Sequence, residues 1–115
     1  KDFEMAGYNG KSRFVLPRHL QYKSGLNVET IAGDKTMTYL DSQHQIINNN
    51  AGGIADIFLP EEKDGANFWF KLDSTSGHNV RILNGAGSDV VNTLVVGKSC
   101  WVMCDGTTWH LLIEA

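Results

Sequence analysis

The sequence predicts an all-β protein: an antiparallel β-sandwich or barrel-like domain, of the jelly-roll or tulip-like kind, preceded by an extended N-terminal arm. Short runs of β-branched and aromatic residues recur at roughly the 8–12-residue spacing that is typical of such folds. Turn-forming residues, including 12 glycines, separate these runs. No stretch of about ten residues or more shows the apolar period of an amphipathic helix.

Length and charge limit the function classes. The chain has 115 residues, which suits a single folded domain, and a net charge of −3. Because no run of lysines and arginines offsets this charge, we expect neither a nucleic-acid partner nor a polybasic membrane anchor. Apolar runs reach only about five residues, far below the roughly 20 that cross a bilayer.

The first 25 residues differ from the rest and are interpreted as the arm. Their apolar residues follow no fixed period, and Gly7, Gly10 and Pro17 interrupt any regular element. The segment is nevertheless too apolar for a solvated tail, so we expect it to lie against a partner subunit or its own domain. The predicted contact residues are Phe3, Tyr8, Phe14, Leu16 and Leu20.

Residues 26–115 form the predicted β domain, in which nine β-prone runs alternate with polar, mostly glycine-containing turns. The runs are 26–31, 36–40, 45–48, 55–60, 67–73, 79–83, 90–96, 100–104 and 108–113. The run ADIFLP ends at Pro60, because proline cannot donate a ladder hydrogen bond. Alternation places several residues together on one face of their strands: Ala55, Ile57 and Leu59; Phe68, Phe70 and Leu72; and Val80 and Ile82. The opposite face then receives Trp69, Lys71 and Arg81.

The last two runs are predicted to form a β-hairpin. Asp105-Gly106 between apolar runs indicates a two-residue type I′ turn. On the core face, the resulting register pairs Cys104 with Thr107, Val102 with Trp109 and Cys100 with Leu111. On the other face, it pairs Trp101 with His110 and Met103 with Thr108. Trp101, Met103 and His110 then face away from the core and need cover. Subunit contact would supply it, and so would a second sheet or the arm.

No residue pattern predicts catalysis, a metal or a cofactor. The four histidines form no tight metal-binding pair. Cys100 and Cys104 lack the CxxC spacing of a zinc site. On one straight strand they would lie about 13 Å apart, too far for a disulfide. Two buried thiols, suited to an intracellular assembly compartment, are the expectation.

The remaining polar and aromatic clusters have simple interpretations. The acidic run EEKDG (61–65) does not follow a calcium-loop pattern and is interpreted as a solvated loop. NGAGS (84–88) is interpreted as a turn. Aromatic residues such as Trp69 and Tyr39 could form a sugar-stacking platform; the alternative is that they fill the core and a subunit interface.

The stretch from Asp41 to Ala115 resembles a β domain that recurs in virion proteins of tailed bacteriophages, in capsid decoration (cement or head-fibre) proteins and in some tail-fibre proteins. The features in order are IINNNAGG (46–53), FLP (58–60), the aromatic strand NFWF (67–70), Gly77-His78 before NVRI (79–82), and the terminal DGTTWHLL (105–112). The similarity covers about two thirds of the chain, and the first 40 residues have no counterpart in it.

The resemblance implies a non-enzymatic virion component, often a homotrimer, that binds the major capsid protein on the outer surface of the head after synthesis in the host cytoplasm. Trp101, Met103 and His110 would suit three-fold packing, and an arm that orders on binding would add buried area across capsomer junctions. The negative charge suits an outer-surface protein better than a DNA-facing one. The alternative is a tail-fibre or receptor-binding module that binds a host surface glycan.

Overall fold

The computed structural model describes residues 3–4, 15–16 and 23–115. The described residues form β-strands and no helix. The strands are β1 (Phe3–Glu4), β2 (Val15–Leu16), β3 (Lys23–Ile31), β4 (Lys35–Thr36), β5 (Ser42–Asn49), β6 (Ala55–Phe58), β7 (Asn67–Leu72), β8 (Val80–Leu83), β9 (Asp89–Leu94), β10 (Ser99–Cys104) and β11 (Trp109–Glu114). β1 and β2 pair with each other in a small antiparallel sheet.

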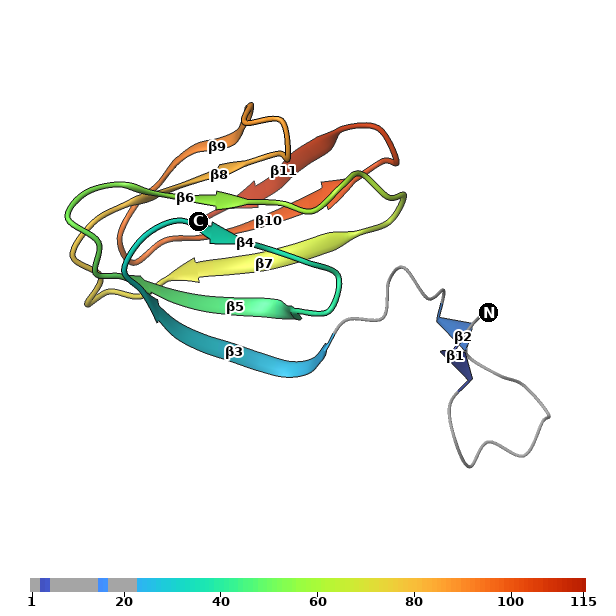
Figure 1. The fold of residues 1–115 in the computed structure, drawn as a ribbon, viewed down its shortest axis with the longest axis horizontal. Helices are drawn as coiled ribbons and strands as arrows, with labels where there is room; N and C mark the ends of the chain where they lie inside the picture. Colours follow the sequence, from blue (N-terminus) through green and yellow to red (C-terminus); the bar gives the residue numbers. More distant parts are fainter. Residues whose placement is uncertain (1–2, 5–14, 17–22) are drawn as a thin grey trace.

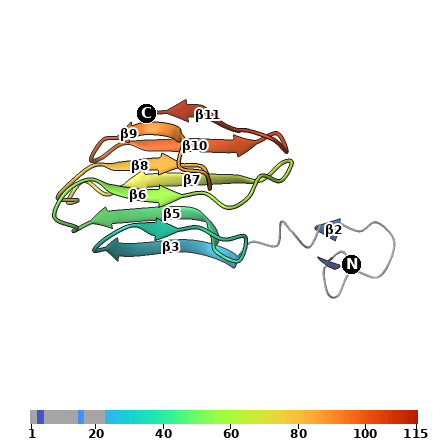
Figure 2. The same cartoon turned by 45° about the horizontal axis from the view of Figure 1, so that its top comes forward.

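The β domain consists of two sheets packed face to face (Figures 1 and 2). One sheet has five strands in the order β11-β10-β7-β5-β3, and the other has four in the order β4-β6-β8-β9. The predicted all-β fold is therefore confirmed, and of the sandwich and barrel-like alternatives the described residues form the sandwich. β3 begins at Lys23, within the range that was interpreted as the arm.

Strand direction differs from the prediction. From β3 to β8 the chain alternates between the two sheets, so β3, β5 and β7 pair in parallel, and so do β4, β6 and β8. Only the last part of the domain is antiparallel, in the pairs β8–β9, β7–β10 and β10–β11. Short runs separated by turns are equally compatible with hairpins and with a coil that changes sheets at every turn, which is why spacing did not reveal the parallel pairs.

The core lies between the two sheets and is built from the residues that alternation predicted. Ala55, Ile57 and Leu59, Phe68, Phe70 and Leu72, and Val80 and Ile82 are all buried. Phe68 lies at the centre of an aromatic cluster, with ring centroids 6.0 Å from Phe70 and 6.1 Å from Trp109. The predicted outward positions of Trp69, Lys71 and Arg81 are confirmed by their partial or full exposure.

The segment 36–40 was predicted as one strand and instead turns. β4 ends at Thr36, Met37 enters the core with 1% of its surface exposed, and Tyr39 packs against the core from its rim. The Asp41 carboxylate accepts a hydrogen bond from the Thr38 N–H (2.7 Å), and the Thr38 carbonyl accepts one from the Asp41 N–H (3.2 Å). The carboxylate therefore holds a turn that the alternating TMTYL pattern did not reveal.

The predicted register of the last hairpin is wrong by two residues. Cys104 lies opposite Trp109, Met103 opposite His110 and Val102 opposite Leu111. A bulge then places Ile113 opposite Trp101. Because a shift of two residues preserves the faces of a strand, Cys100, Val102, Cys104 and Trp109 are still buried as predicted. Leu111, predicted to face the core, is 37% exposed on the edge strand β11.

The turn chemistry explains this error. A type I′ turn needs positive φ at both central residues, but only Gly106 (φ 97°) has it here. The connection is a longer loop, residues 105–108, in which the Asp105 side chain accepts hydrogen bonds from the N–H groups of Thr107 (2.9 Å) and Thr108 (2.8 Å). These bonds favour the longer loop over the two-residue turn.

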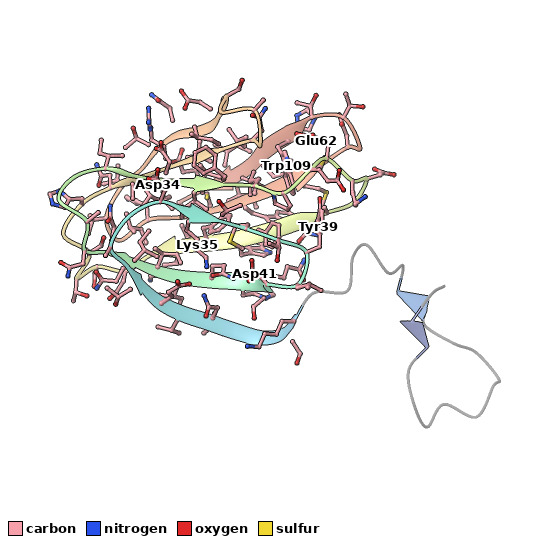
Figure 3. The ribbon with its side chains drawn as sticks, viewed as in Figure 1. Asp34, Lys35, Tyr39, Asp41, Glu62 and Trp109 are labelled. Carbon is pink, nitrogen blue, oxygen red and sulfur yellow. The ribbon has the colours of Figure 1, made fainter. Side chains whose placement is uncertain are left out.

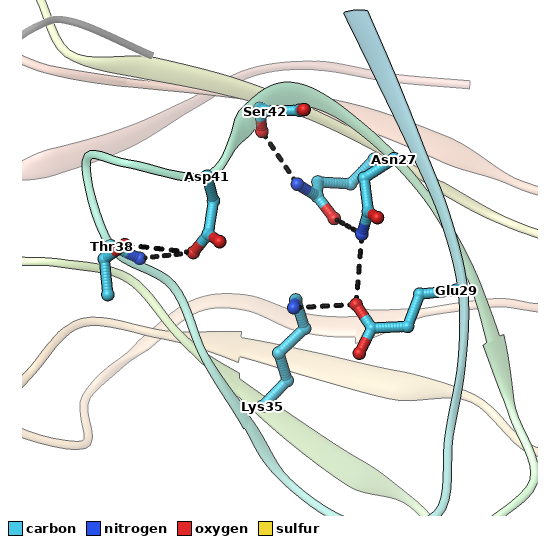
Figure 4. Close-up of polar contacts among 7 residues, drawn as sticks. Asn27, Glu29, Lys35, Thr38, Asp41 and Ser42 are labelled. Carbon is cyan, nitrogen blue, oxygen red and sulfur yellow. Dashed lines mark hydrogen bonds and ion pairs between the residues drawn. The ribbon is translucent and has the colours of Figure 1, made fainter. Parts of the chain in front are cut away.

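At the β3 end, the space between the sheets is closed by a polar network (Figure 4). The Asn27 amide donates to Glu29 (3.0 Å) and Gln45 (2.7 Å), and Lys35 of β4 donates to Glu29 at 2.8 Å. The Lys35 hydrogen bond holds the pKa of Glu29 below its usual value. Charged side chains that point inward at an edge strand disfavour pairing with another strand. The core therefore ends in a polar cap on this side.

Candidate interaction surface

The side of the five-stranded sheet that points away from the other sheet, termed the outer face, gathers several exposed apolar side chains. It carries Leu26 and Val28 (β3), His44 and Ile46 (β5), Trp69 (β7), Trp101 and Met103 (β10), and His110, Leu112 and Ile113 (β11). Leu26 is 56% exposed, Val28 69% and Ile113 49%. Apolar side chains with this much exposure on one face typically mark an interface.

The strand registers join these residues into a continuous strip. Ile113 lies opposite Trp101, and Trp101 lies opposite Trp69. Trp69 in turn lies opposite His44, which lies opposite Leu26. The strip therefore crosses all five strands in one lateral row. A second apolar pair, Val28 and Ile46, lies beside it.

Two stacked tryptophans form the centre of the strip. The Trp69 and Trp101 ring centroids are 4.9 Å apart, and their planes differ by 5°. The Trp101 indole N–H also donates to Asn67 at 3.3 Å. Stacking of this kind contributes about 0.5–1.5 kcal/mol beyond burial and fixes both rings. The outer face thus presents a rigid, half-buried aromatic centre.

The outward side of the four-stranded sheet is different in character. Arg81 donates two hydrogen bonds to Asp56, at 2.8 and 3.0 Å, in a bidentate ion pair. The Asp34 carboxylate accepts the Asp56 N–H at 2.9 Å. The outward side of the four-stranded sheet therefore carries ion-paired charges, whereas the outer face combines a row of apolar side chains with polar ones such as Lys71 and Asn67.

A pocket of about 240 Å³, which we term the end pocket, lies where the outer face meets the β10–β11 loop. Met103, Cys104 and Leu112 provide apolar lining, and Asp64, Gly65, Asp105 and His110 complete it. His110 Nε2 lies 2.8 Å from Asp105 Oδ2. This contact, with the Thr107 and Thr108 N–H bonds, lowers the pKa of Asp105 from 3.8 to about 2.

The depressed pKa predicts how acid affects the loop. A carboxylate whose pKa is lower in the folded state stabilises the fold above its ordinary pKa, and that stabilisation disappears as the pH falls through the folded value. Above pH 3.8, the free energy of unfolding is therefore expected to be larger for the wild-type protein than for Asp105→Asn. This difference should shrink as the pH falls toward about 2. Urea unfolding of both proteins across this range measures it, and a difference that does not change with pH would contradict the assignment.

The cysteines have the environment of core residues. Cys100 and Cys104 are both buried and unbonded to each other. Burial raises the pKa of the Cys100 thiol to about 12, which disfavours the thiolate that nucleophilic or metal chemistry requires. Within residues 23–115, no three His, Cys, Asp or Glu side chains gather in a way that could hold a metal ion.

Tyr39 is engaged at the rim of the core. Its hydroxyl donates to the Glu61 carbonyl, and its ring stacks on Phe68 with centroids 6.4 Å apart. Trp109 donates to the neighbouring Pro60 carbonyl at 3.2 Å. Figure 3 shows both side chains at the same end of the sandwich. A sugar-stacking role for Tyr39 would require these contacts to be broken.

The predicted partner-binding residues fall into two groups. Trp101, Met103 and His110 lie together on the outer face, although Trp101 pairs with Ile113 rather than with His110, and Met103 pairs with His110 rather than with Thr108. In the arm, the backbones of Phe3 and Leu16 lie opposite each other in β1 and β2. Tyr8, Phe14 and Leu20 lie outside the described residues.

The β3 and β5 part of the outer face was not predicted from the sequence. In LNVETI the apolar residues Leu26 and Val28 point outward, while Asn27 and Glu29 share the inner face with Gln45 and Ile47. Alternation revealed the two faces of this strand but not which of them faces the core. A sequence signal that could have revealed this arrangement is a strand with one polar and one apolar side, in which the polar side caps the sandwich and the apolar side points outward.

In comparisons with known proteins, neither a family model nor a curated protein sequence matches this chain. Of the described residues, none belong to a helix with the length and apolar character required to cross a bilayer.

Proposed function

We propose that this chain is a non-enzymatic virion structural protein: a capsid decoration protein that binds the outer surface of a tailed-phage head and stabilises the shell across capsomer junctions. The observation that carries the proposal is the apolar outer face, centred on the Trp69–Trp101 stack. The resemblance of residues 41–115 to virion β domains supplies the biological context. The major capsid protein is the proposed partner.

The size of the outer face supports two contact regions rather than one. Five strands about 4.8 Å apart and about six residues long present a patch of roughly 400 Å². A stable interface buries about 800 Å² on each partner. The outer face alone falls short, so we assign further contact area to the arm and its residues Phe3, Tyr8, Phe14, Leu16 and Leu20. A homotrimer is the proposed assembly.

Deletion of the arm tests this proposal. A variant lacking residues 1–22 retains every strand of the two-sheet domain, because β3 begins at Lys23. We expect it to fold, with an unchanged urea midpoint, but to lose saturable binding to capsids stripped of the native protein. The matched control is the full chain with Lys98→Ala, an exposed residue far from the arm junction. An arm-less variant that still saturates the capsids would refute the attachment role.

The exposure of Trp69 supports a second candidate function, that of a glycan-binding tail-fibre module. Its indole is partly exposed in the middle of the outer face, and aromatic rings of this kind can stack on sugars. Titration with host surface polysaccharide would then quench tryptophan fluorescence saturably, and Trp69→Ala would remove the effect. Absence of quenching across a broad polysaccharide panel would eliminate this candidate.

A further inference from the structure

A charged side chain, that of Lys71, lies in the middle of the outer face. Lys71 belongs to β7, the central strand of the five-stranded sheet, which Figure 1 shows between β5 and β10. It is exposed, and it lies opposite Ile46 on one side and Ser99 on the other. Trp69 is two residues away on the same side of the strand, a separation of about 7 Å. The charge therefore adjoins the aromatic centre of the face.

The Lys71 ammonium has no partner of opposite charge in the β domain. It makes no hydrogen bond or ion pair with any residue from 23 to 115. The next carboxylate along the chain, that of Asp73, already accepts hydrogen bonds from Thr75 (2.5 Å) and Asn48 (3.5 Å). The Thr75 hydrogen bond in particular holds the pKa of Asp73 below its ordinary value. Lys71 is thus available to a carboxylate from another molecule.

A partner that covers the aromatic centre also covers this charge. Burial of Trp69 and Trp101 removes water from the neighbouring Lys71. Transfer of an ammonium group out of water is strongly unfavourable unless a group of opposite charge pairs with it. A carboxylate on the partner meets this requirement, and complementary charges also fix the alignment of the two surfaces. The outer face therefore favours a partner that carries an acidic group beside its apolar residues.

Two other occupants match this face less well. In an isologous contact a second copy presents the same patch, so it would bring one Lys71 toward another. A glycan would place hydroxyl groups against the aliphatic side chains of Leu26, Val28 and Ile113, which offer no hydrogen bonds. These side chains are 56%, 69% and 49% exposed. A protein surface can supply both apolar side chains for these positions and the carboxylate.

We infer that the surface of the major capsid protein that covers the outer face is apolar and carries an aspartate or glutamate that pairs with Lys71. This inference rests on the proposed function and specifies the chemistry of the partner. The apolar part of the partner packs on the Trp69–Trp101 stack. Lys71 then determines specificity, because an apolar surface without the carboxylate would leave its charge buried and unpaired.

Zero-length carbodiimide cross-linking of the full chain bound to stripped capsids tests the inference. The reagent joins an amine to a carboxylate in direct contact, so we expect a link from Lys71 to an aspartate or glutamate of the major capsid protein. The ion pair between Lys35 and Glu29, at 2.8 Å, is the positive control within the chain. Absence of a Lys71 link from bound chains in which the Lys35–Glu29 link forms would overturn the inference.

Titration of variants onto the same capsids gives an independent measurement. Lys71→Arg keeps the charge and should bind within about threefold of wild type. Lys71→Met keeps an apolar stem without the charge, and it should bind about 30-fold more weakly, as expected when one member of a buried charge pair is removed. Lys63→Met is the matched control, because Lys63 lies in the loop between β6 and β7 and should not affect affinity. Urea unfolding confirms that each variant is folded.

The outcomes separate this inference from the proposed function. Lys71→Met that binds as tightly as wild type would overturn the inference and leave capsid binding intact. Wild type that does not bind the capsids would refute the proposed function and the inference with it. Polygalacturonate, an acidic polysaccharide, is the probe for the other source of carboxylates. Saturable quenching of tryptophan fluorescence by polygalacturonate in wild type but not in Lys71→Met would overturn the assignment of the face to a protein.

Discussion

Replacement of Phe68 by alanine is expected to destabilise the protein by about 3–5 kcal/mol, the range for a fully buried phenylalanine in a close-packed core. Phe68 has 0% of its surface exposed. Its ring contacts come from three separate parts of the chain, through Tyr39, Phe70 and Trp109. Loss of the ring would leave a cavity that neither sheet can close without moving the other. For a domain of this size, whose total stability is about 5–15 kcal/mol, that is a large fraction.

Urea unfolding followed by tryptophan fluorescence measures this effect. Val95→Ala is a suitable control, because Val95 is 46% exposed and lies between β9 and β10. We expect the control to change stability by less than about 0.5 kcal/mol. A loss of under about 1 kcal/mol for Phe68→Ala would mean that the two sheets are not packed around this ring.

The second large effect concerns binding. Trp101→Ala is expected to weaken capsid binding by about 30-fold, because an aromatic residue at the centre of an interface typically contributes 2 kcal/mol or more. Trp101 stacks on Trp69 in the middle of the outer face, so its removal also frees its neighbour to move. The fold should survive, because both rings lie on the outward side of the sheet and are only partly buried.

Phe58→Ala provides the matched control. Phe58 is also an aromatic residue of intermediate burial, but it belongs to β6 in the four-stranded sheet. Affinities are measured by titration of both variants onto stripped capsids, with unfolding curves to confirm that each is folded. Equal losses in the two variants would show that binding does not discriminate between the two sides of the sandwich.

The sequence predicted the core well because burial leaves a local signature. Alternation placed Phe68, Phe70 and Leu72 on one side of their strand and Trp69 on the other, and the structure confirms both. A period of two follows from strand geometry alone and does not depend on which strands pair. Because this period carries no information about strand pairing, the parallel pairing of β3, β5 and β7 was missed. That pairing is determined by contacts between residues distant in the sequence.

The candidate surface was predicted only in part, for a related reason. Trp101 and Met103 were recognised as outward-facing because they alternate with the core face of their strand, and His110 because the predicted hairpin placed it on the same side. Leu26 and Val28 were not recognised, because their strand has one polar and one apolar side, and the polar side was needed to cap the sandwich with Asn27 and Glu29. The hairpin register failed at one residue: Asp105 bonds two downstream N–H groups instead of adopting the positive φ of a type I′ turn.

The central claim, a decoration protein on the capsid surface, is tested most directly by the number of copies of this chain in purified virus particles. Quantitative mass spectrometry against an isotope-labelled standard of the full chain, normalised to the major capsid protein, gives that number. The account predicts hundreds of copies per particle. A handful of copies would contradict it and assign the chain to the tail, and complete absence from the particle would contradict a virion role altogether.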